Sequence, residues 1–300
     1  MTGHAAGRTA VPGPPPRWAR LGRRLQRLPA MLAVVVLVAL TLVASGAPVL
    51  APHDPFAQNL DGRLAPPAWA GGTPTHWLGT DQLGRDILSR LIFGARVSLI
   101  VALMAVVIAG VTGVVMGLLA GYYGGLVDEV LMRLADLRMA LPFILLVIAL
   151  IAVFGPSLVL VIAILGLTGW VAYARVLRAE VLSLREREFV VAARALGATD
   201  LRLVFRHILP NGIASAIVIA SLELAQMIVV ESSLSFLGLG VQPPTPSWGN
   251  MLGEGRDYVQ SKWWLATFPG LAIALTTVSV NLVGDWLRDR LDPHLQVSSG

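Results

Sequence analysis

Long apolar runs limit the possible folds of this 300-residue chain more than any other feature of its sequence. A helix needs about 20 mostly apolar residues to cross a lipid bilayer. Charged residues make up only 14% of the chain, against roughly 25% in an average soluble domain. The sequence therefore predicts an all-α integral membrane protein with six transmembrane helices. They are expected within residues 30–50, 97–120, 139–154, 157–177, 212–236 and 266–287.

The segments outside these runs divide the rest of the chain. Residues 1–29 form a basic, proline-rich tail, a composition that favours disorder. A basic flank before the run 30–50 is also typical of a signal peptide, but the run is too long and others follow, so we expect an uncleaved first helix. Residues 51–95 form a polar insert that precedes a core membrane domain over 96–295. Within that domain, the run 139–154 is short, and we expect its helix to extend backwards into 128–140.

The distribution of positive charge indicates which side of the membrane each segment occupies. Six spans place both termini on the same side. With that topology, 17 of the 23 Arg and Lys residues share the side of the N-terminus, in 1–29, 121–138, 175–210 and 288–300. Cytoplasmic loops carry an excess of positive charge. The sequence therefore predicts that both termini are cytoplasmic.

Small residues recur at strict four-residue spacing along the second span. In membranes, small residues at this spacing let two helix backbones approach closely. We therefore expect this helix to lie in the centre of the bundle. The residues are Ala105, Ala109, Gly113, Gly117 and Gly121.

A basic, helix-prone segment at 184–210 separates the fourth and fifth spans. One helix is expected over 184–196, with Gly197 as its left-handed cap. A second is expected over 200–209, stopped by Pro210. Such a pair is compatible with a plain solvated loop, a DNA-binding helix-turn-helix, or a docking element for a cytoplasmic protein. Both ends of the segment are attached to membrane spans, which leaves little room for a DNA duplex. Docking of a cytoplasmic protein is therefore favoured, and no nucleic acid is expected.

This segment resembles the EAA loop of permease subunits of ATP-binding-cassette (ABC) importers. Ala192, Ala193 and Gly197 match that pattern, and so does the terminal Leu209–Pro210; Val191 stands where the family has Glu, and His207 where it has Ile. The resemblance implies a coupling loop that fits into a groove on a separate ATPase subunit. The residues expected to contact the ATPase are Glu188, Ala192, Ala193, Arg194, Gly197, Ala198, His207 and Pro210.

Further motifs are similar to the dipeptide, oligopeptide and nickel branch of these permeases, and the moderate insert resembles its C-type subunit. The motifs are HWLGTDQLGRDILSRLIFGARVSL (76–99), GYYGGLVDEVLMRLADLRMALP (121–142), ESSLSFLGLGVQPPTPSWGNML (231–252) and NLVGDWLRDRLDP (281–293). The resemblance implies an ABC type I importer permease (MetI-like) fold in a bacterial plasma membrane. It also implies that the chain forms half of a pathway for di- or oligopeptides or a related small solute.

Several partners follow from the same resemblance. They are a paralogous B-type permease, an extracytoplasmic solute-binding protein, and two cytoplasmic P-loop ATPases, or one fused ATPase, that bind ATP and Mg²⁺. The sequence itself supports a separate ATPase, because this chain has no P-loop. A P-loop requires GxxxxGK[ST], and the only lysine, Lys262, lies in QSKWW. No cofactor is therefore expected on this chain.

Polar residues inside the fifth span are the remaining candidates for a function. Glu223, Gln226 and Glu231 fall in its apolar sequence, where a carboxylate costs about 3 kcal/mol and needs a cavity or a partner. They either line a translocation path or form structural contacts at the permease interface, and the structural role is favoured for Glu231. Two intramembrane carboxylates also leave a proton-coupled secondary carrier as the alternative function.

The sequence contains no recognisable catalytic or metal-binding motif. The histidines show no paired spacing, and neither HExxH nor GxSxG occurs. There is no cysteine to supply a thiolate. We therefore expect neither catalytic residues nor metal ligands. The histidines are His4, His53, His76, His207 and His294.

Overall fold

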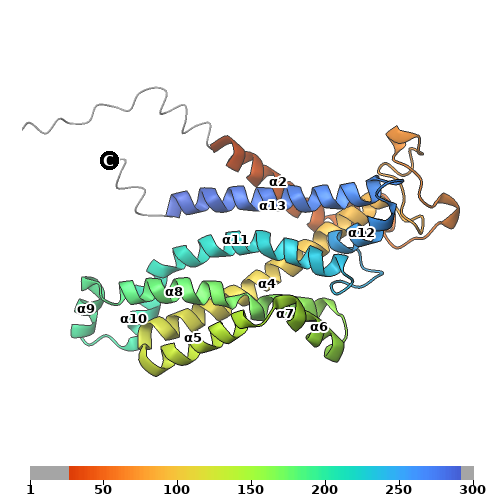
Figure 1. The fold of residues 1–300 in the computed structure, drawn as a ribbon. Coiled ribbons are helices and arrows are strands. Elements are labelled where there is room, and N and C mark those ends of the chain that lie inside the picture. The colour runs from red at the N-terminus through yellow and green to blue at the C-terminus, as the bar shows by residue number, and fades with distance from the viewer. Residues whose placement is uncertain (1–26, 292–300) are drawn as a thin grey trace, which may run out of the picture.

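The computed structural model describes residues 27–291, and every regular element in that range is helical (Figure 1). The tail expected to be disordered therefore lies, up to residue 26, outside the described residues. The longer helices are α2 Arg27–Ser45, α4 Ile87–Tyr123, α5 Gly125–Ala140, α6 Phe143–Phe154, α7 Leu158–Thr168, α8 Trp170–Leu184, α9 Glu188–Ala195, α11 Leu209–Phe236, α12 Trp248–Gly255 and α13 Trp264–Leu291. The short elements are α3 Ala47–Leu50, η1 Leu60–Gly62, η2 Ala68–Ala70, α10 Asp200–Leu203, the π turn η3 Val204–Ile208 and η4 Arg256–Tyr258.

The membrane-crossing helices agree with the apolar runs. Five helical stretches are long and apolar enough to span, and the bent pair α5–α6 makes a sixth if it counts as one span. The predicted all-α membrane architecture is therefore confirmed. The five are Leu28–Ser45, Ile87–Tyr123, Leu158–Leu184, Asp200–Phe236 and Trp264–Leu291.

The third span differs from the prediction. Residues 128–140 do not continue as a straight helix into the apolar run, because α5 and α6 meet at an angle of 87°. The break lies at Leu141–Pro142, where Leu141 adopts an extended conformation with ψ 123°. Proline disfavours the α conformation in the residue before it, so this dipeptide ends α5 and lets α6 start in a new direction.

The second span begins ten residues earlier than predicted, at Ile87, inside the stretch expected to be insert. The Asp86 side chain caps it by accepting a hydrogen bond from the Ser89 backbone N–H at 2.8 Å. Such a cap satisfies one of the amide groups that a helix start leaves unpaired. The resulting helix of 37 residues is about 55 Å long and therefore extends beyond the apolar part of a bilayer.

Helix α4 occupies the centre of the bundle and packs against α2, α7, α8 and α11. All five small residues of its predicted stripe are buried. A Cβ atom built on Gly113 would lie 2.5 Å from the Trp170 carbonyl oxygen, and one on Gly117 would lie 2.7 Å from that of Ala174. The predicted close approach is thus confirmed, and the neighbouring helix is α8.

The bundle has two distinct ends (Figure 1). One, called here the insert end, carries residues 51–86 and α12. The other, the loop end, carries α9 and α10, and both the start of α2 and the end of α13 lie toward it. Helices α2 and α13 pack against each other along one side of the bundle.

Four charged side chains form a group of ion pairs that connects the insert to α4 and α12. Arg85 Nε donates to Asp81 at 2.6 Å, and Arg85 Nη2 donates to Glu254 at 2.9 Å. Arg90 hydrogen-bonds the same two carboxylates, reaching Glu254 Oε2 at 2.6 Å. Both arginines and Asp81 are almost fully buried. We call this group the insert ion cluster; it joins residues more than 160 positions apart.

Candidate functional site

The basic segment 184–210 lies at the loop end as two short helices, with boundaries that differ from those predicted (Figure 1). Helix α8 ends at Leu184 and α9 starts at Glu188, so 184–196 is not one helix. The chain turns at Arg187, whose ψ of 143° is extended. Arg185 reaches back to the end of α4, where its Nη1 donates to the Gly121 carbonyl oxygen at 3.0 Å.

The predicted cap at Gly197 is present. Gly197 has φ +84°, the left-handed conformation that suits glycine. Its N–H donates to the Arg194 carbonyl at 3.0 Å, and the Ala198 N–H donates to that of Ala193 at 3.1 Å. These two bonds form a Schellman motif, which closes α9 and turns the chain toward α10.

Pro210 does not stop the second helix as expected. The chain runs on from Asp200 through the π turn Val204–Ile208 into α11, so that Asp200–Phe236 is one long helical stretch. A proline inside a regular α-helix clashes with the carbonyl four residues earlier, which here belongs to Arg206. The wider π turn ends immediately before Leu209–Pro210 and accommodates the ring without ending the helix.

Buried apolar residues anchor this segment to the bundle. Val190 of α9, Leu203 of α10 and Ile208 of the π turn are fully buried in a cluster with residues near the C-terminal ends of α4 and α8. The Tyr122 hydroxyl of α4 adds a polar anchor, donating to the Asp200 carboxylate at 2.6 Å. The loop is therefore a fixed part of the bundle.

The same loop exposes five large apolar side chains. Leu196 is 89% exposed, Leu201 68% and Phe205 61%, and Phe189 and Val191 are also exposed. We call these five residues the loop apolar patch. Of the predicted coupling residues, five are exposed and three are half-buried, and two of the half-buried ones, Ala193 and Ala198, pack against the buried cluster. The exposed ones are Glu188, Ala192, Arg194, Gly197 and Pro210, and the third half-buried one is His207. The ring of His207 lies against that of Phe189, with centroids 6.4 Å apart.

A separate cavity of about 570 Å³ opens between α5, α6, α7, α8 and α11. Two of the predicted path residues, Glu223 and Gln226, line it. Arg138 and Arg175 line it too, although no sequence pattern points to them as cavity residues. Apolar side chains such as Phe143 and Met227 make up much of the rest. The cavity thus presents one carboxylate and two guanidinium groups in an apolar setting.

Glu231, the third predicted path residue, does not line this cavity. Its side chain is fully buried and accepts a hydrogen bond from the Ser235 hydroxyl at 2.7 Å. Ser98 of α4 and Ser247 before α12 are further polar neighbours of this carboxylate. The four-residue spacing along α11 predicts the Ser235 contact, whereas the other two depend on the packing of distant segments. Glu231 therefore holds α11, α4 and the α12 region together, in line with the structural role favoured from the sequence.

Comparison with known proteins identifies the family. Residues 113–297 match the model of the binding-protein-dependent transport system inner membrane component. The chain belongs to this permease family. Residues 18–67 of the permease match a second model, the N-terminal transmembrane domain of oligopeptide transport permease C. Because the family forms the membrane part of ABC importers, the permease is a multi-pass inner membrane protein.

Similar permeases occur in several bacteria. The dipeptide transport system permease protein DppC of Escherichia coli K12 is 47% identical over 89% of this chain and 89% of the relative. The di/tripeptide transport system permease protein DppC of Pseudomonas aeruginosa is 45% identical over 89% of this chain and 88% of the relative. These are transport permeases, and nothing in them favours the secondary carrier.

A solved structure supports the fold. An inward-facing form of the MetNI methionine ABC transporter contains a chain that aligns with the permease at a TM-score of 0.50. The match has 20% sequence identity and covers 69% of this permease and 98% of that chain. The MetI-like architecture expected from the motifs is thus confirmed.

Proposed function

We propose that this permease is the C-type subunit of a peptide importer and that residues 184–210 couple it to separate cytoplasmic ATPases. The observation that carries this proposal is the loop apolar patch. Five large apolar side chains project from a loop that is firmly anchored beneath them. Large exposed apolar side chains on an otherwise polar loop are typical of a protein interface. The partner surface would be an apolar groove on the ATPase.

The loop supplies specificity as well as apolar area. Glu188, Arg194 and Arg202 are exposed beside the apolar patch and offer charges of both signs to a partner. The left-handed turn at Gly197 has no other atom within 4 Å of a hypothetical Cβ, so the turn stands clear of the bundle. A protruding, fixed helix pair of this kind transmits force when ATPases that bind ATP and Mg²⁺ close together.

The cavity supports a peptide substrate, in line with the names of the relatives. A dipeptide at neutral pH carries one ammonium and one carboxylate. Glu223 offers a partner for the first, and Arg138 offers one for the second; Arg175 lines the same cavity but already donates to Asp136 Oδ1 at 2.7 Å. The volume of about 570 Å³ falls in the range of small-molecule sites. We therefore place Glu223 and Gln226 on the substrate path, with a B-type permease closing its other half.

The proposed orientation places the loop end in the cytoplasm. Residues 175–210 carry seven arginines, and positive charge concentrates on that side. The beginning of α2 and the end of α13 lie toward the same end of the bundle, so both termini would be cytoplasmic. The insert end would then face the solute-binding protein outside the cell.

The decisive experiment introduces a charge into the loop apolar patch. Leu196→Glu should reduce recovery of the ATPases in a mild-detergent pull-down roughly tenfold or more, because a central apolar contact is lost. Uptake of a labelled dipeptide should fall in parallel. Leu196 is 89% exposed, so the variant should insert and fold normally.

Val259→Glu is the matched control, since Val259 is exposed at the insert end and 52% accessible. It should leave ATPase recovery unchanged. Full recovery of the ATPases with Leu196→Glu would contradict the coupling role of the loop. If Leu196→Glu loses the ATPases but the natural permease takes up a different solute and no dipeptide, the coupling role stands and the peptide substrate is excluded.

A further inference from the structure

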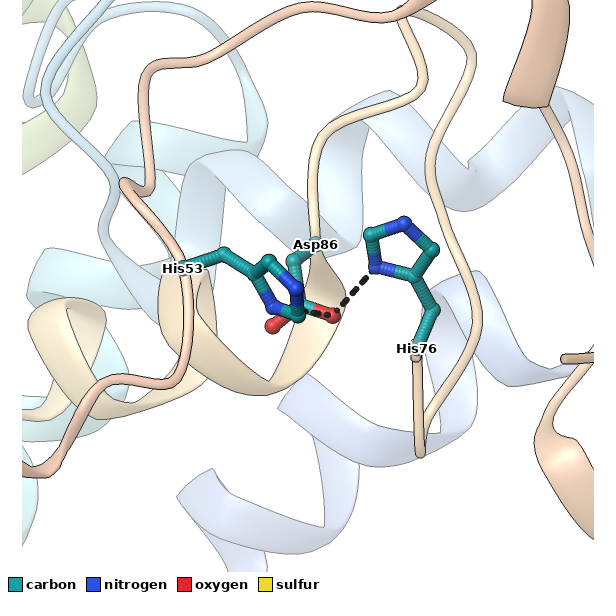
Figure 2. A group of neighbouring side chains, drawn as sticks. All are labelled: His53, His76 and Asp86. Carbon is teal, nitrogen blue, oxygen red and sulfur yellow. Dashed lines mark hydrogen bonds and ion pairs between the residues drawn. The ribbon is translucent and has the colours of Figure 1, made fainter. Parts of the chain in front are cut away.

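The fold brings together two histidines and an aspartate that are far apart in the sequence (Figure 2). His53 follows α3, His76 lies in a turn of the insert, and Asp86 caps α4. The His76 Nδ1 atom lies 2.9 Å from Asp86 Oδ1, and the His53 Nδ1 atom lies 3.7 Å from the same oxygen. The two imidazole rings are 4.7 Å apart and both face this carboxylate.

These distances match what a small cation requires. Nitrogen and oxygen ligands bind Zn²⁺ at roughly 2.0–2.2 Å, which places tetrahedral ligands about 3.3 Å from one another. The two measured ligand separations, 2.9 and 3.7 Å, lie on either side of that value. All three ligand atoms lie within 4.8 Å of one another, so small side-chain rotations complete the geometry.

His53 Nδ1 supplies an independent argument. This atom is buried and has no hydrogen-bond partner among the described residues. Its 3.7 Å separation from Asp86 Oδ1 is too long for a hydrogen bond. A buried polar atom without a partner is costly, and most such atoms are satisfied by a bond, a water or an ion. A metal ion between the three side chains would satisfy it.

A second layer of contacts fixes the ligands. Asp86 Oδ2 accepts hydrogen bonds from the Ser89 backbone N–H at 2.8 Å and the Ser89 hydroxyl at 2.7 Å. Asp86 Oδ1 is thereby aimed at the histidines. The same Ser89 hydroxyl accepts a bond from the His53 backbone N–H at 3.0 Å. Outer contacts of this kind are what orient ligands in metal sites.

We propose that His53, His76 and Asp86 bind one divalent transition-metal ion of the zinc class. Two imidazole nitrogens and one carboxylate oxygen suit Zn²⁺, Ni²⁺ or Co²⁺, whereas Mg²⁺ and Ca²⁺ prefer oxygen ligands alone. Three protein ligands leave a fourth position for water or a partner group. The ion has a route in, because the His53 side chain is 38% exposed and lines a hollow of about 380 Å³.

The ion would tie three separate segments together at the insert end. It would join the chain after the first span to the insert turn and to Asp86, the cap of the second span. The insert would then be held at a fixed height over α4, on the side that is proposed to meet the solute-binding protein. The site itself stands independently of the peptide substrate and of the coupling loop.

The test uses the full-length permease in nanodiscs, stripped of metal and purified without a histidine tag. Titration with Co²⁺ should give visible absorption bands and a stoichiometry of one ion per chain, with Zn²⁺ displacing it. His53→Ala and His76→Ala should each weaken binding at least tenfold. Asp86→Asn keeps a good helix cap but should also weaken binding, because the charged ligand is lost.

Two further variants show whether these three side chains, and no others, hold the ion. His53→Cys should restore binding and add a sulfur-to-cobalt charge-transfer band, which is unambiguous because the chain has no cysteine. The combined variant His4→Ala, His207→Ala and His294→Ala should bind like the natural chain. Absence of Co²⁺ and Zn²⁺ binding by the natural chain, or unchanged binding in His53→Ala and His76→Ala, would overturn the proposal and leave an ordinary pair of histidines beside Asp86.

Discussion

Two groups of side chains, one at each end of the permease, are built in opposite ways. At the insert end, the charged side chains of the insert ion cluster are buried and bonded to one another. At the loop end, Leu196, Leu201 and Phe205 are left exposed above buried anchors. Burying charges is costly unless each is paired, and exposing apolar groups is costly unless a partner covers them. The insert ion cluster therefore pairs its charges within one chain, whereas under the proposed coupling role the exposed apolar side chains of the loop would be covered by the ATPase.

The largest expected effect comes from breaking the insert ion cluster. Arg90→Ala leaves Asp81 and Glu254 with one cation fewer, which should lower the free energy of unfolding by about 3–5 kcal/mol. Thermal unfolding in detergent measures the loss. Arg256→Ala is the control, because Arg256 is exposed and, within residues 27–291, pairs only with its neighbour Asp257, so its removal should cost about 1 kcal/mol or less. Equal melting temperatures for the two variants would show that the cluster does not stabilise this end.

Two leucines two positions apart sharpen the contrast at the loop end. Leu203→Ala empties a fully buried site and should lower the free energy of unfolding by about 2–5 kcal/mol. Leu201→Ala changes an exposed side chain and should alter stability by about 0.5 kcal/mol at most, yet reduce uptake. Melting temperature and uptake should be measured on both variants. A Leu201→Ala variant that melts as early as Leu203→Ala would mean that the loop apolar patch is part of the core.

A smaller effect is expected where α4 and α8 touch between the two ends. Gly113→Ala forces a methyl group against the Trp170 carbonyl and should cost about 1–3 kcal/mol. Gly110→Ala is the matched control on the same helix, because its new methyl group would meet Tyr173 at an ordinary 3.5 Å. That variant should be neutral or slightly stabilising, since alanine favours helix. Thermal unfolding should therefore rank Gly113→Ala below Gly110→Ala, and the reverse order would contradict the close helix contact.

Features set by nearby residues could be predicted from the sequence. Hydrophobic length identifies the spans, and four-residue spacing identifies the tightly packed face of α4, because both properties belong to a single helix. The turn at Gly197 is predictable for the same reason. The dipeptide Leu141–Pro142 also carries a local signal for the break between α5 and α6, which the apolar run around it obscures.

Features that depend on packing could not be predicted in this way. The π turn before Pro210 forms because Leu203 and Ile208 are both anchored in one apolar cluster. Ser98 and Ser247 come to Glu231 from segments other than α11, and Arg138 of α5 and Arg175 of α8 line one cavity because separate helices pack around it. His53 and His76 meet because the insert folds back over Asp86. None of these contacts leaves a spacing pattern along the chain.

In the continuous helical stretch Asp200–Phe236, the loop end lies much farther from Phe236 than the cavity residue Glu223 does. At 1.5 Å per residue, Asp200 lies about 54 Å from Phe236, and Glu223 lies only about 20 Å from it. A tilt of about 10° around Phe236 would carry the Asp200 end through roughly 9 Å and move Glu223 by roughly 3 Å. Under the proposed coupling role, a large movement at the loop would therefore produce a displacement about three times smaller at the cavity wall.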